Sequence, residues 1–239
     1  VRCFLERELS LHFKIRTAAN GKEALRVLEE EEISLVVSDV MMPEMNGFEL
    51  CRTIKSQLPF SHIPVILLTA LTDERQRIFG ITGGADDYIQ KPFHTDYVKI
   101  KIIHLLQERQ KLRERLLEKL RDNKLLLSEP EKVESIDDTF LRKFAEQIEA
   151  VYADPEYNVE KLSETLGLSR GHLHRKIKEL TGTAPVEFLR TYRLNKATQL
   201  LRQNAYTVSE VAYRTGFSSP AYFSKCFKAV YGVTPTEYQ

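Results

Sequence analysis

Hydrophobic residues in the first hundred positions of this sequence gather in short runs separated by longer amphipathic stretches. The runs at 33–37 and 64–70 are nearly continuous and rich in β-branched side chains, which predicts strands buried on both faces of a parallel sheet. The run at 85–93 predicts a shorter strand followed by a loop. Alternating apolar and polar residues at 13–18 predict one further strand.

Helical periodicity fills the intervals between these runs. Apolar residues three and four positions apart predict helices at 1–11, 22–31, 48–57, 73–82 and from Asp96 onward. Strands that alternate with helices are typical of a doubly wound fold around a parallel sheet. We therefore expect the first part of the chain to belong to the α/β class.

The last of these helices is predicted to run from Asp96 to Leu127, and residues 128–135 then predict a linker. Its apolar positions lie three, four or seven residues apart, at Ile102, Leu105, Leu112, Leu116 and Leu120. Two interpretations fit this stripe equally. It forms a short coiled coil between two copies of the chain, or it lies as a single amphipathic helix on its own domain.

The last hundred residues contain an internal repeat of hydrophobic pattern. Each copy predicts a short helix, a glycine turn and a second helix, at 159–180 and again at 208–231, which is helix-turn-helix spacing. A long helix at 185–203 separates the copies, and a helix at 137–151 precedes them. The expected buried residues are Leu173, Ile177 and Leu180 in the first copy and Phe223, Phe227 and Val230 in the second.

Composition allows two globular domains. The chain has 239 residues, of which 42% are hydrophobic and 29% charged. No apolar run approaches the roughly 18 residues of a membrane span, and no signal peptide is evident, so we expect no membrane contact. Cys3, Cys51 and Cys226 are widely spaced and odd in number, which argues against a disulfide framework and fits a cytoplasmic protein.

Charge divides the chain unevenly, although its net charge is only +1. From Thr165 onward there are eleven lysines and arginines against four acidic residues, so this part carries about +7 and the rest about −6. A basic C-terminal module made of helix-turn-helix units favours double-stranded DNA as its partner.

The residues at 38–47 (SDVMMPEMNG) carry the first candidate for chemistry. They place Asp39 at the carboxyl end of a predicted strand, where open α/β sheets bind their ligands. The alternative is that Asp39 only caps the next helix, which is a common role for aspartate. The whole pattern resembles the phosphoacceptor loop of a response regulator receiver domain, and the resemblance covers residues 1–106.

This resemblance implies a role for several residues. Asp39 would accept a phosphoryl group from a histidine kinase domain, Thr69 and Lys91 would bind that group, and Tyr88 would be the aromatic residue that turns inward with Thr69. The Lys91-Pro92 peptide would be cis, which is essentially a proline phenomenon. Binding would rest on charge-assisted hydrogen bonds.

One departure from the receiver pattern concerns Mg²⁺. A receiver opens with a strand that ends in an acidic pair, and this pair holds Mg²⁺ together with the phosphoacceptor. The sequence begins at Val1, inside the expected first helix, so we expect a flavodoxin-like receiver that lacks its first strand and was cut from a longer chain. Asp39 and the backbone of Met41 remain as metal ligands, which are few for Mg²⁺.

The second helix-turn-helix copy and the residues that follow it, at 212–238, resemble the DNA-binding domain of AraC/XylS-type transcription regulators. The resemblance covers residues 139–239 and implies an all-α domain that binds double-stranded DNA at direct repeats. Its geometry directs two sets of residues toward base edges: Gly171, His174 and Arg175, and Pro220, Ala221, Ser224 and Lys225.

Other residues of the same helices are candidates for phosphate contacts. Arg175 best suits guanine, because the guanidinium fork matches its O6 and N7 atoms. Lysine is the expected phosphate ligand, and Ser169 and Ser219 either bind phosphate or cap their helices. The expected phosphate-binding or DNA-facing residues are Arg170, Lys176, Lys178, Lys228, Ser169 and Ser219.

Together these features predict a receiver at 1–106, a helical connector and linker at 107–138, and a DNA-binding domain at 139–239. The expected function is a non-enzymatic response regulator whose transcription-factor activity depends on phosphorylation of Asp39. The resemblance implies a homodimer when phosphorylated and contact with RNA polymerase.

Three alternatives to this function stay open. The chain is the C-terminal output portion of a hybrid histidine kinase, or it binds DNA independently of phosphorylation through a degenerate receiver. The third is a doubly wound enzyme such as an aspartyl-phosphate phosphatase, which the absence of an Asp-x-Asp motif after Asp39 disfavours.

Overall fold

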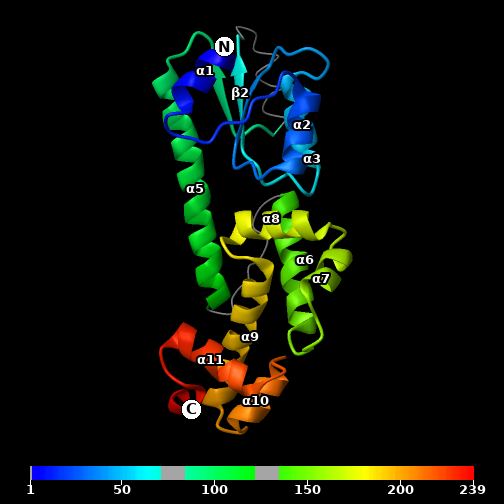
Figure 1. The fold of residues 1–239 in the computed structure, drawn as a ribbon, viewed down its shortest axis with the longest axis vertical. Helices are drawn as coiled ribbons and strands as arrows, with labels where there is room; N and C mark the ends of the chain where they lie inside the picture. The colour runs from blue at the N-terminus through cyan, green and yellow to red at the C-terminus, as the bar shows by residue number, and fades with distance from the viewer. Residues whose placement is uncertain (1, 71–83, 122–134) are drawn as a thin grey trace. The chain divides into compact units, whose positions relative to one another are not determined.

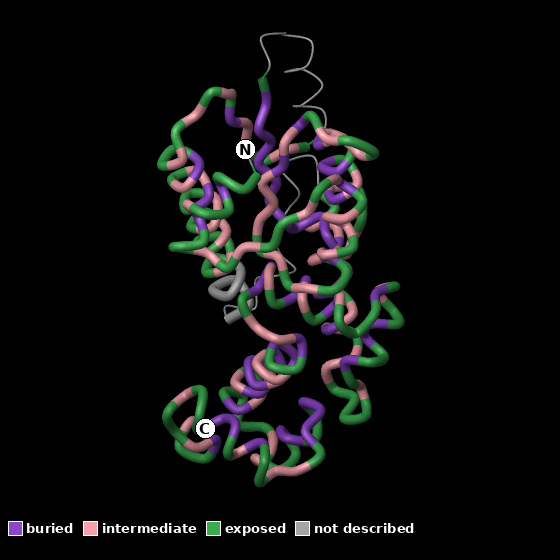
Figure 2. The backbone as a smooth tube through the Cα atoms, turned by 45° about the horizontal axis from the view of Figure 1, so that its top comes forward, coloured by how far each residue is buried: buried purple, intermediate pink, exposed green. Residues whose placement is uncertain are grey.

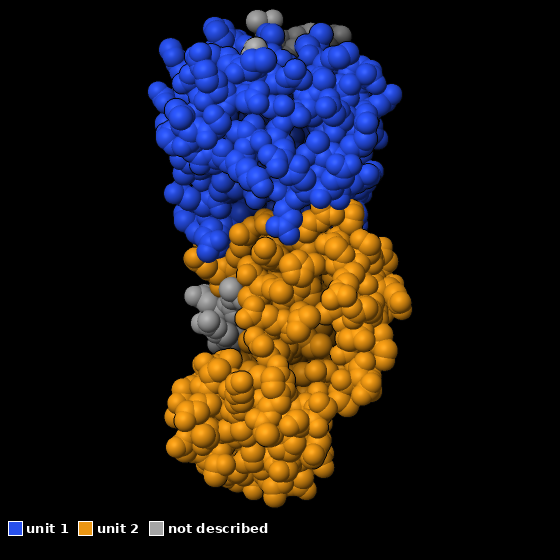
Figure 3. Space-filling model, in the orientation of Figure 1, with its two compact units in different colours: residues 1–112 blue, residues 113–239 orange. Residues whose placement is uncertain are grey.

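The computed structural model describes residues 2–70, 84–121 and 135–239 of the chain, with the side chains of 116–121 left out. The chain divides into two compact units, residues 1–112 and 113–239 (Figure 3). None of the helices in the described ranges has the length and apolarity that crossing a membrane requires.

The first unit is built around a parallel sheet, as the sequence predicts. In its described part the sheet has three strands in the order β1-β2-β3, with Asp39 opposite Leu68 and Thr69 opposite Gln90. The predicted helix at 73–82 lies outside the described residues. The elements are α1 (Arg2–Leu9), α2 (Gly21–Glu30), β1 (Val36–Asp39), α3 (Gly47–Ser56), β2 (Val65–Thr69), β3 (Asp87–Gln90) and α5 (Thr95–Arg121).

Helices cover both faces of this sheet, which confirms the doubly wound arrangement (Figure 1). On one face, Leu28 of α2 and Leu50 and Ile54 of α3 pack with Leu67. On the other face, the side chains of α1 and α5 pack with Ile66 and Leu68. Every residue of β2 is therefore buried, as the tube in Figure 2 also shows.

Two strand predictions need correction. Residues 13–18 form no strand, although Phe13 and Ile15 turn toward the core beside α1. The alternation there reflects burial of one face of the segment, because a strand also needs a hydrogen-bonded neighbour. β1 packs on both faces of the sheet through Val36 and Val37, but its residues other than Ser38 are only half-buried. It pairs with only β2 in the described sheet, and an edge strand has fewer neighbours to cover it.

The apolar residues along α5 are buried near its start and exposed farther along the helix. Ile102 is buried and Leu105 packs beside it, both in the core cluster that contains α1. Leu112, farther along the helix, is 52% exposed. The first turns of α5 therefore lie on their own domain, as one of the two interpretations predicts. The side chains of Leu116 and Leu120 lie outside the described residues.

The second unit is entirely helical in its described part. Side-chain caps begin most of these helices, and glycines with positive φ at 182 and 232 end two of them. The helices are α6 (Ile136–Val151), α7 (Val159–Thr165), α8 (Arg170–Thr181), α9 (Pro185–Arg202), α10 (Val208–Arg214), α11 (Pro220–Tyr231) and α12 (Pro235–Tyr238). They match the predicted order, with two helix-turn-helix units on either side of α9.

The repeat positions form matching cores in the two units. Leu173 and Ile177 of α8 are fully buried, as are Phe223 and Phe227 of α11. The prediction for Val230 is wrong, because it is 50% exposed. Cys226 takes the buried place beside Phe223 and Phe227, since it lies on the same helical face and Val230 falls in the last turn.

The cysteines give a direct test of this fold. We expect iodoacetamide to label exposed Cys3 in the native chain, whereas Cys51 and Cys226 should react only after unfolding because both are buried. Burial also raises the pKa of the Cys51 thiol to about 11, which keeps it protonated and unreactive. Peptide mass spectrometry before and after denaturation measures this. Labelling of native Cys51 at the rate of Cys3 would contradict the fold of the first unit.

Candidate phosphoacceptor site and nucleic-acid interface

Asp39 is the last residue of β1, and its surroundings fix the loop that follows. The Val40 amide donates to the Leu68 carbonyl across the sheet (3.0 Å), and the Gly47 amide donates back to the Val40 carbonyl (3.0 Å). A Cβ at Gly47 would lie 2.3 Å from the carbonyl oxygen of Asp39. The close return of the chain therefore requires glycine at 47.

Lys91 meets the Asp39 carboxylate at the carboxyl edge of the sheet. It follows β3, where its amide donates to the Thr69 carbonyl (2.7 Å), and its Nζ atom pairs with Oδ2 of Asp39. The other carboxylate oxygen, Oδ1, accepts from the Met41 amide (3.0 Å). The side chains of Asp39 and Lys91 are 28% and 24% exposed, so the ion pair is open to a small solute. The Lys91-Pro92 peptide is cis, which confirms that prediction.

Thr69 lies on β2, which pairs with β1, and Tyr88 lies on β3, the next strand of the sheet. Thr69 ends β2 and is 7% exposed, and Tyr88 stands opposite Leu67 in the β2–β3 ladder. Tyr88 packs partly buried against the core cluster of α2 and α3, and burial raises its pKa to about 12. Its phenol therefore stays neutral at physiological pH. The structure brings Asp39, Thr69 and Lys91 to the ends of three adjacent strands.

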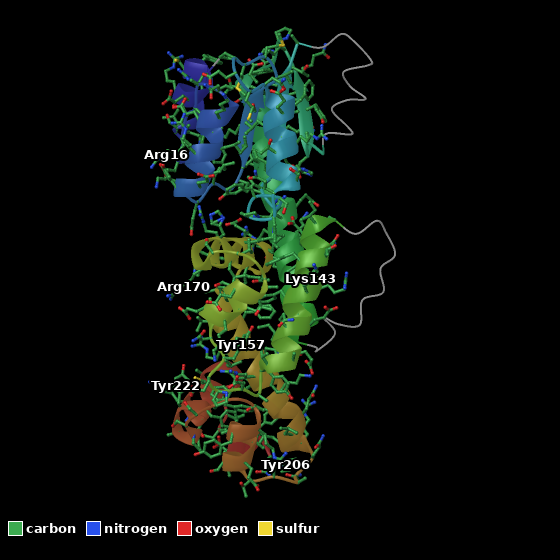
Figure 4. The ribbon with its side chains drawn as sticks, turned by 90° about the vertical axis from the view of Figure 1, so that its right-hand side faces the viewer. Arg16, Lys143, Tyr157, Arg170, Tyr206 and Tyr222 are labelled. Carbon is green, nitrogen blue, oxygen red and sulfur yellow. The ribbon has the colours of Figure 1, made fainter. Side chains whose placement is uncertain are left out.

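In the second unit, α8 presents a polar surface opposite its buried residues. Gly171, His174 and Lys178 are exposed, and Arg175 is half-buried. Arg170, labelled in Figure 4, projects from the start of α8 and pairs with Glu160 of α7 (2.7 Å). This is the face that the sequence directs toward DNA.

The corresponding surface of α11 carries the second set of candidates. Ala221, Lys225 and Lys228 are exposed, Ser224 is half-buried, and Pro220 occupies the first helical position. Ser219 caps α11 by accepting from the Tyr222 amide (3.4 Å). Ser169 caps α8 in the same way, through the His172 amide (3.3 Å). Both serines therefore have the capping role, and a phosphate contact by either one stays a prediction.

Lys176 is not a phosphate ligand, contrary to the sequence prediction. Its side chain is 0% exposed, and its Nζ atom lies 2.6 Å from Oδ1 of Asp137 at the start of α6. The ammonium also lies 5.1 Å from the centre of the Phe140 ring. Residue type suggested a DNA contact, but the position of Lys176 beside Ile177 on the inner face of α8 turns it into the core.

Two family models match this chain. The model of the response regulator receiver domain matches residues 1–103, and the model of a helix-turn-helix domain matches residues 162–239. Residues 1–103 therefore form a response regulator receiver domain, and residues 162–239 form a helix-turn-helix domain. The receiver match lies in the first unit, and the helix-turn-helix match begins within α7 and runs through α12 in the second unit.

Individual proteins resemble the chain over one or both parts. Histidine kinase P4 of Formosa agariphila is 38% identical over all 239 residues, but the chain spans only 17% of that protein. The transcriptional regulatory protein GltR of Pseudomonas aeruginosa is 41% identical over 46% of each chain. The C-terminal domain of the response regulator yesN from Fusobacterium nucleatum shares 33% identity, over 40% of this chain and 93% of its own, with a TM-score of 0.39.

The oxygens expected to hold Mg²⁺ do not form a complete site. Both carboxylate oxygens of Asp39 are engaged, one with Lys91 and one with the Met41 amide. Within the described ranges, no three His, Cys, Asp or Glu side chains gather where a metal ion could bind. Mg²⁺ prefers six oxygen ligands in octahedral geometry, so Asp39 and the Met41 carbonyl do not suffice.

Buried Lys176 and exposed Lys178 allow a matched test of the helix-turn-helix domain. We expect Lys176→Ala to lower the free energy of unfolding by about 2–3 kcal/mol, because it leaves a cavity and removes the buried ammonium that pairs with Asp137. Lys178→Ala should change stability by no more than about 0.5 kcal/mol, as surface substitutions usually do. Urea unfolding followed by circular dichroism measures both. Equal effects of the two substitutions would contradict the buried position of Lys176.

Proposed function

We propose that this chain is the output of a two-component system, in which phosphorylation of Asp39 controls DNA binding by the helix-turn-helix domain. The observation that carries the proposal is the meeting of Asp39, Thr69 and Lys91 at three adjacent strand ends, in a chain that also holds two helix-turn-helix units. The modules we assign are 1–106, 107–138 and 139–239. The chain itself would have no enzymatic activity and would work in the cytoplasm, where DNA is found.

Asp39, Lys91 and Thr69 each have a role in the proposed phosphoryl transfer. An oxygen of the Asp39 carboxylate attacks the phosphorus of a kinase phosphohistidine, and a P–O bond forms as the P–N bond breaks. The electron pair of that bond stays on the imidazole nitrogen, which takes a proton from water. The Lys91 ammonium, already paired with Asp39, then pairs with the phosphoryl oxygens, and the Thr69 hydroxyl donates to another.

The negative charge of the phosphoryl group on Asp39 drives the change of conformation. A phosphoryl group adds about −1.5 to −2 charges at pH 7 and three acceptor oxygens, which draws Thr69 toward it. Tyr88 fills the space that Thr69 leaves, by turning further into the core that it already touches. Two phosphorylated receivers then pair as a homodimer. Pairing raises the effective concentration of the DNA-binding domains at neighbouring direct repeats without any new base contact.

DNA binding would use the exposed faces of α8 and α11. The base-reading set is Gly171, His174, Arg175, Pro220, Ala221, Ser224 and Lys225, and the phosphate-binding set is Arg170, Lys178, Ser219 and Lys228. The excess of about seven positive charges in this part supports an electrostatic contribution to binding. A bound homodimer would contact RNA polymerase to affect transcription.

A second arrangement is favoured by one comparison. Histidine kinase P4 resembles the chain from end to end and is far longer. The same receiver and DNA-binding domain would then follow a kinase on one polypeptide, and transfer to Asp39 would occur within that polypeptide or its dimer. A histidine kinase core encoded in the same reading frame, ahead of Val1, would support this arrangement, whereas a separate kinase gene would support the first.

Phosphorylation of Asp39 is tested by intact-mass spectrometry after incubation with acetyl phosphate and Mg²⁺. We expect the polypeptide encoded by the gene to gain one phosphoryl group, because Lys91 and Thr69 stabilise it there. The Asp39→Ala variant should gain none, and Lys91→Ala should gain it more slowly. The 239-residue chain is measured beside them to find whether it suffices.

Two results would contradict this assignment. A phosphoryl group that survives in Asp39→Ala would place the acceptor elsewhere. No gain in any variant, including the full gene product with a kinase domain as donor, would reduce the receiver to a structural domain.

DNA recognition is tested with a site selected by the chain from a random DNA pool. Arg175→Ala should weaken binding by about 1–3 kcal/mol and relax the preference at one base pair, because it removes a bidentate contact. Lys228→Ala should weaken binding evenly across sequences and lower the salt slope by about 1. Lys143→Ala, on the exposed side of α6 (Figure 4), is the control and should change neither. Fluorescence anisotropy at several salt concentrations measures all three.

A further inference from the structure

Arg193 links three elements of the helix-turn-helix domain. It lies on α9, from which its Nε atom donates to the Tyr152 carbonyl (2.8 Å) and its Nη2 atom donates to the Asp154 carbonyl (2.7 Å). Tyr152 is the C-cap of α6, and Asp154 lies in the turn that follows. Carbonyls at the end of a helix lack partners within that helix, so the guanidinium fork satisfies two acceptors in a fixed geometry.

The turn of the second helix-turn-helix unit packs closely against Arg193 and the Tyr152 carbonyl. Gly216, between α10 and α11, is buried and has φ of +79°. A Cβ there would lie 2.1 Å from the Tyr152 carbonyl oxygen and 2.8 Å from Nε of Arg193. The end of α6, helix α9 and the turn before α11 therefore meet at Arg193. We name this meeting of Arg193, Tyr152, Asp154 and Gly216 the Arg193 clasp.

Further polar contacts of α9 hold the helices beside the clasp. On one side of α9, Lys196 pairs with Glu149 of α6 (2.8 Å), and its ammonium lies 5.4 Å from the centres of the Tyr152 and Tyr192 rings. On the other side, buried Asn195 accepts from the Tyr231 hydroxyl at the end of α11 (2.6 Å). Polar contacts join α9 to both halves of the domain, so the halves cannot rotate independently without breaking them.

A protein that reads DNA with two helices, here α8 and α11, depends on the distance and angle between them. One inserted base pair shifts a half-site by about 3.4 Å along the duplex and turns it by about 35°. We propose that Arg193 is a positioning residue, which fixes α8 relative to α11 and so makes the domain select one spacing between the two DNA segments it reads. This inference rests on the proposed function in DNA binding.

The test compares binding to DNA sites that differ only in spacing. The full chain first selects a site from a random pool, and footprinting assigns the segments covered by the two recognition helices. Affinity is then measured for that site and for sites with one base pair inserted or removed between the segments. We expect the unmodified chain to lose about tenfold in affinity on each change, since one helix loses its base contacts.

Loosening the clasp should reduce this discrimination. Arg193→Met keeps the aliphatic stem but loses both hydrogen bonds, so we expect its loss of affinity on respacing to fall to about threefold or less. Gly216→Ala should act in the same direction, because its methyl group would push the turn from Tyr152. The matched control is Arg190→Met on the same helix. Arg190 pairs with exposed Glu187 (3.4 Å), so this variant should keep the tenfold loss.

Folding is checked by thermal unfolding of each variant. If Arg193→Met does not fold, Arg193→Lys decides the question, because an ammonium reaches one carbonyl where the guanidinium reaches two, and discrimination should be intermediate. Unchanged spacing discrimination in a folded Arg193 variant would overturn the inference and leave DNA binding intact. A chain that enriches no DNA site would instead overturn the proposed function, and the inference with it.

Discussion

The ladder on both sides of β2 is the constraint on which the receiver site depends. Val65–Thr69 pairs with β1 on one side and β3 on the other, and all of its side chains are buried. Because the three strands are parallel and in register, Asp39 and Lys91 leave the sheet at the same edge, on either side of Thr69. The ion pair between them follows from this register and not from any closeness in sequence, since the two residues are 52 positions apart.

Helix α9 is the central element of the helix-turn-helix domain, as β2 is of the receiver, but it holds its neighbours through side-chain contacts. A sheet shares its backbone hydrogen bonds between strands, whereas a helix uses them internally. The helices around α9 must therefore be joined by packing and by polar groups such as Arg193, Lys196 and Asn195. None of these three residues belongs to the proposed base-reading set, so the residues that join the helices and the residues proposed to meet DNA are separate sets.

Lysine and arginine illustrate how one residue type serves both sets. Lys178 is exposed two positions after Lys176, which is fully buried and paired with Asp137. Arg175 lies half-buried on the outer side of α8, whereas Arg193 binds backbone carbonyls inside the domain. A count of positive charges in the last third of the chain therefore overstates the number available to DNA.

The order of helices and strands, the position of Asp39 at a strand end and the repeat of two helix-turn-helix units could all be predicted from the sequence, because local periodicity and turn residues carry that information. Three outcomes could be learned only from the folded chain: 13–18 pairs with no strand in the described part of the sheet, Val230 is exposed and Lys176 is buried. Each of these outcomes depends on which neighbour lies beside a residue. The clasp at Arg193 was likewise beyond sequence reasoning, since its partners are backbone carbonyls about 40 residues away, and a carbonyl has no signature in the sequence.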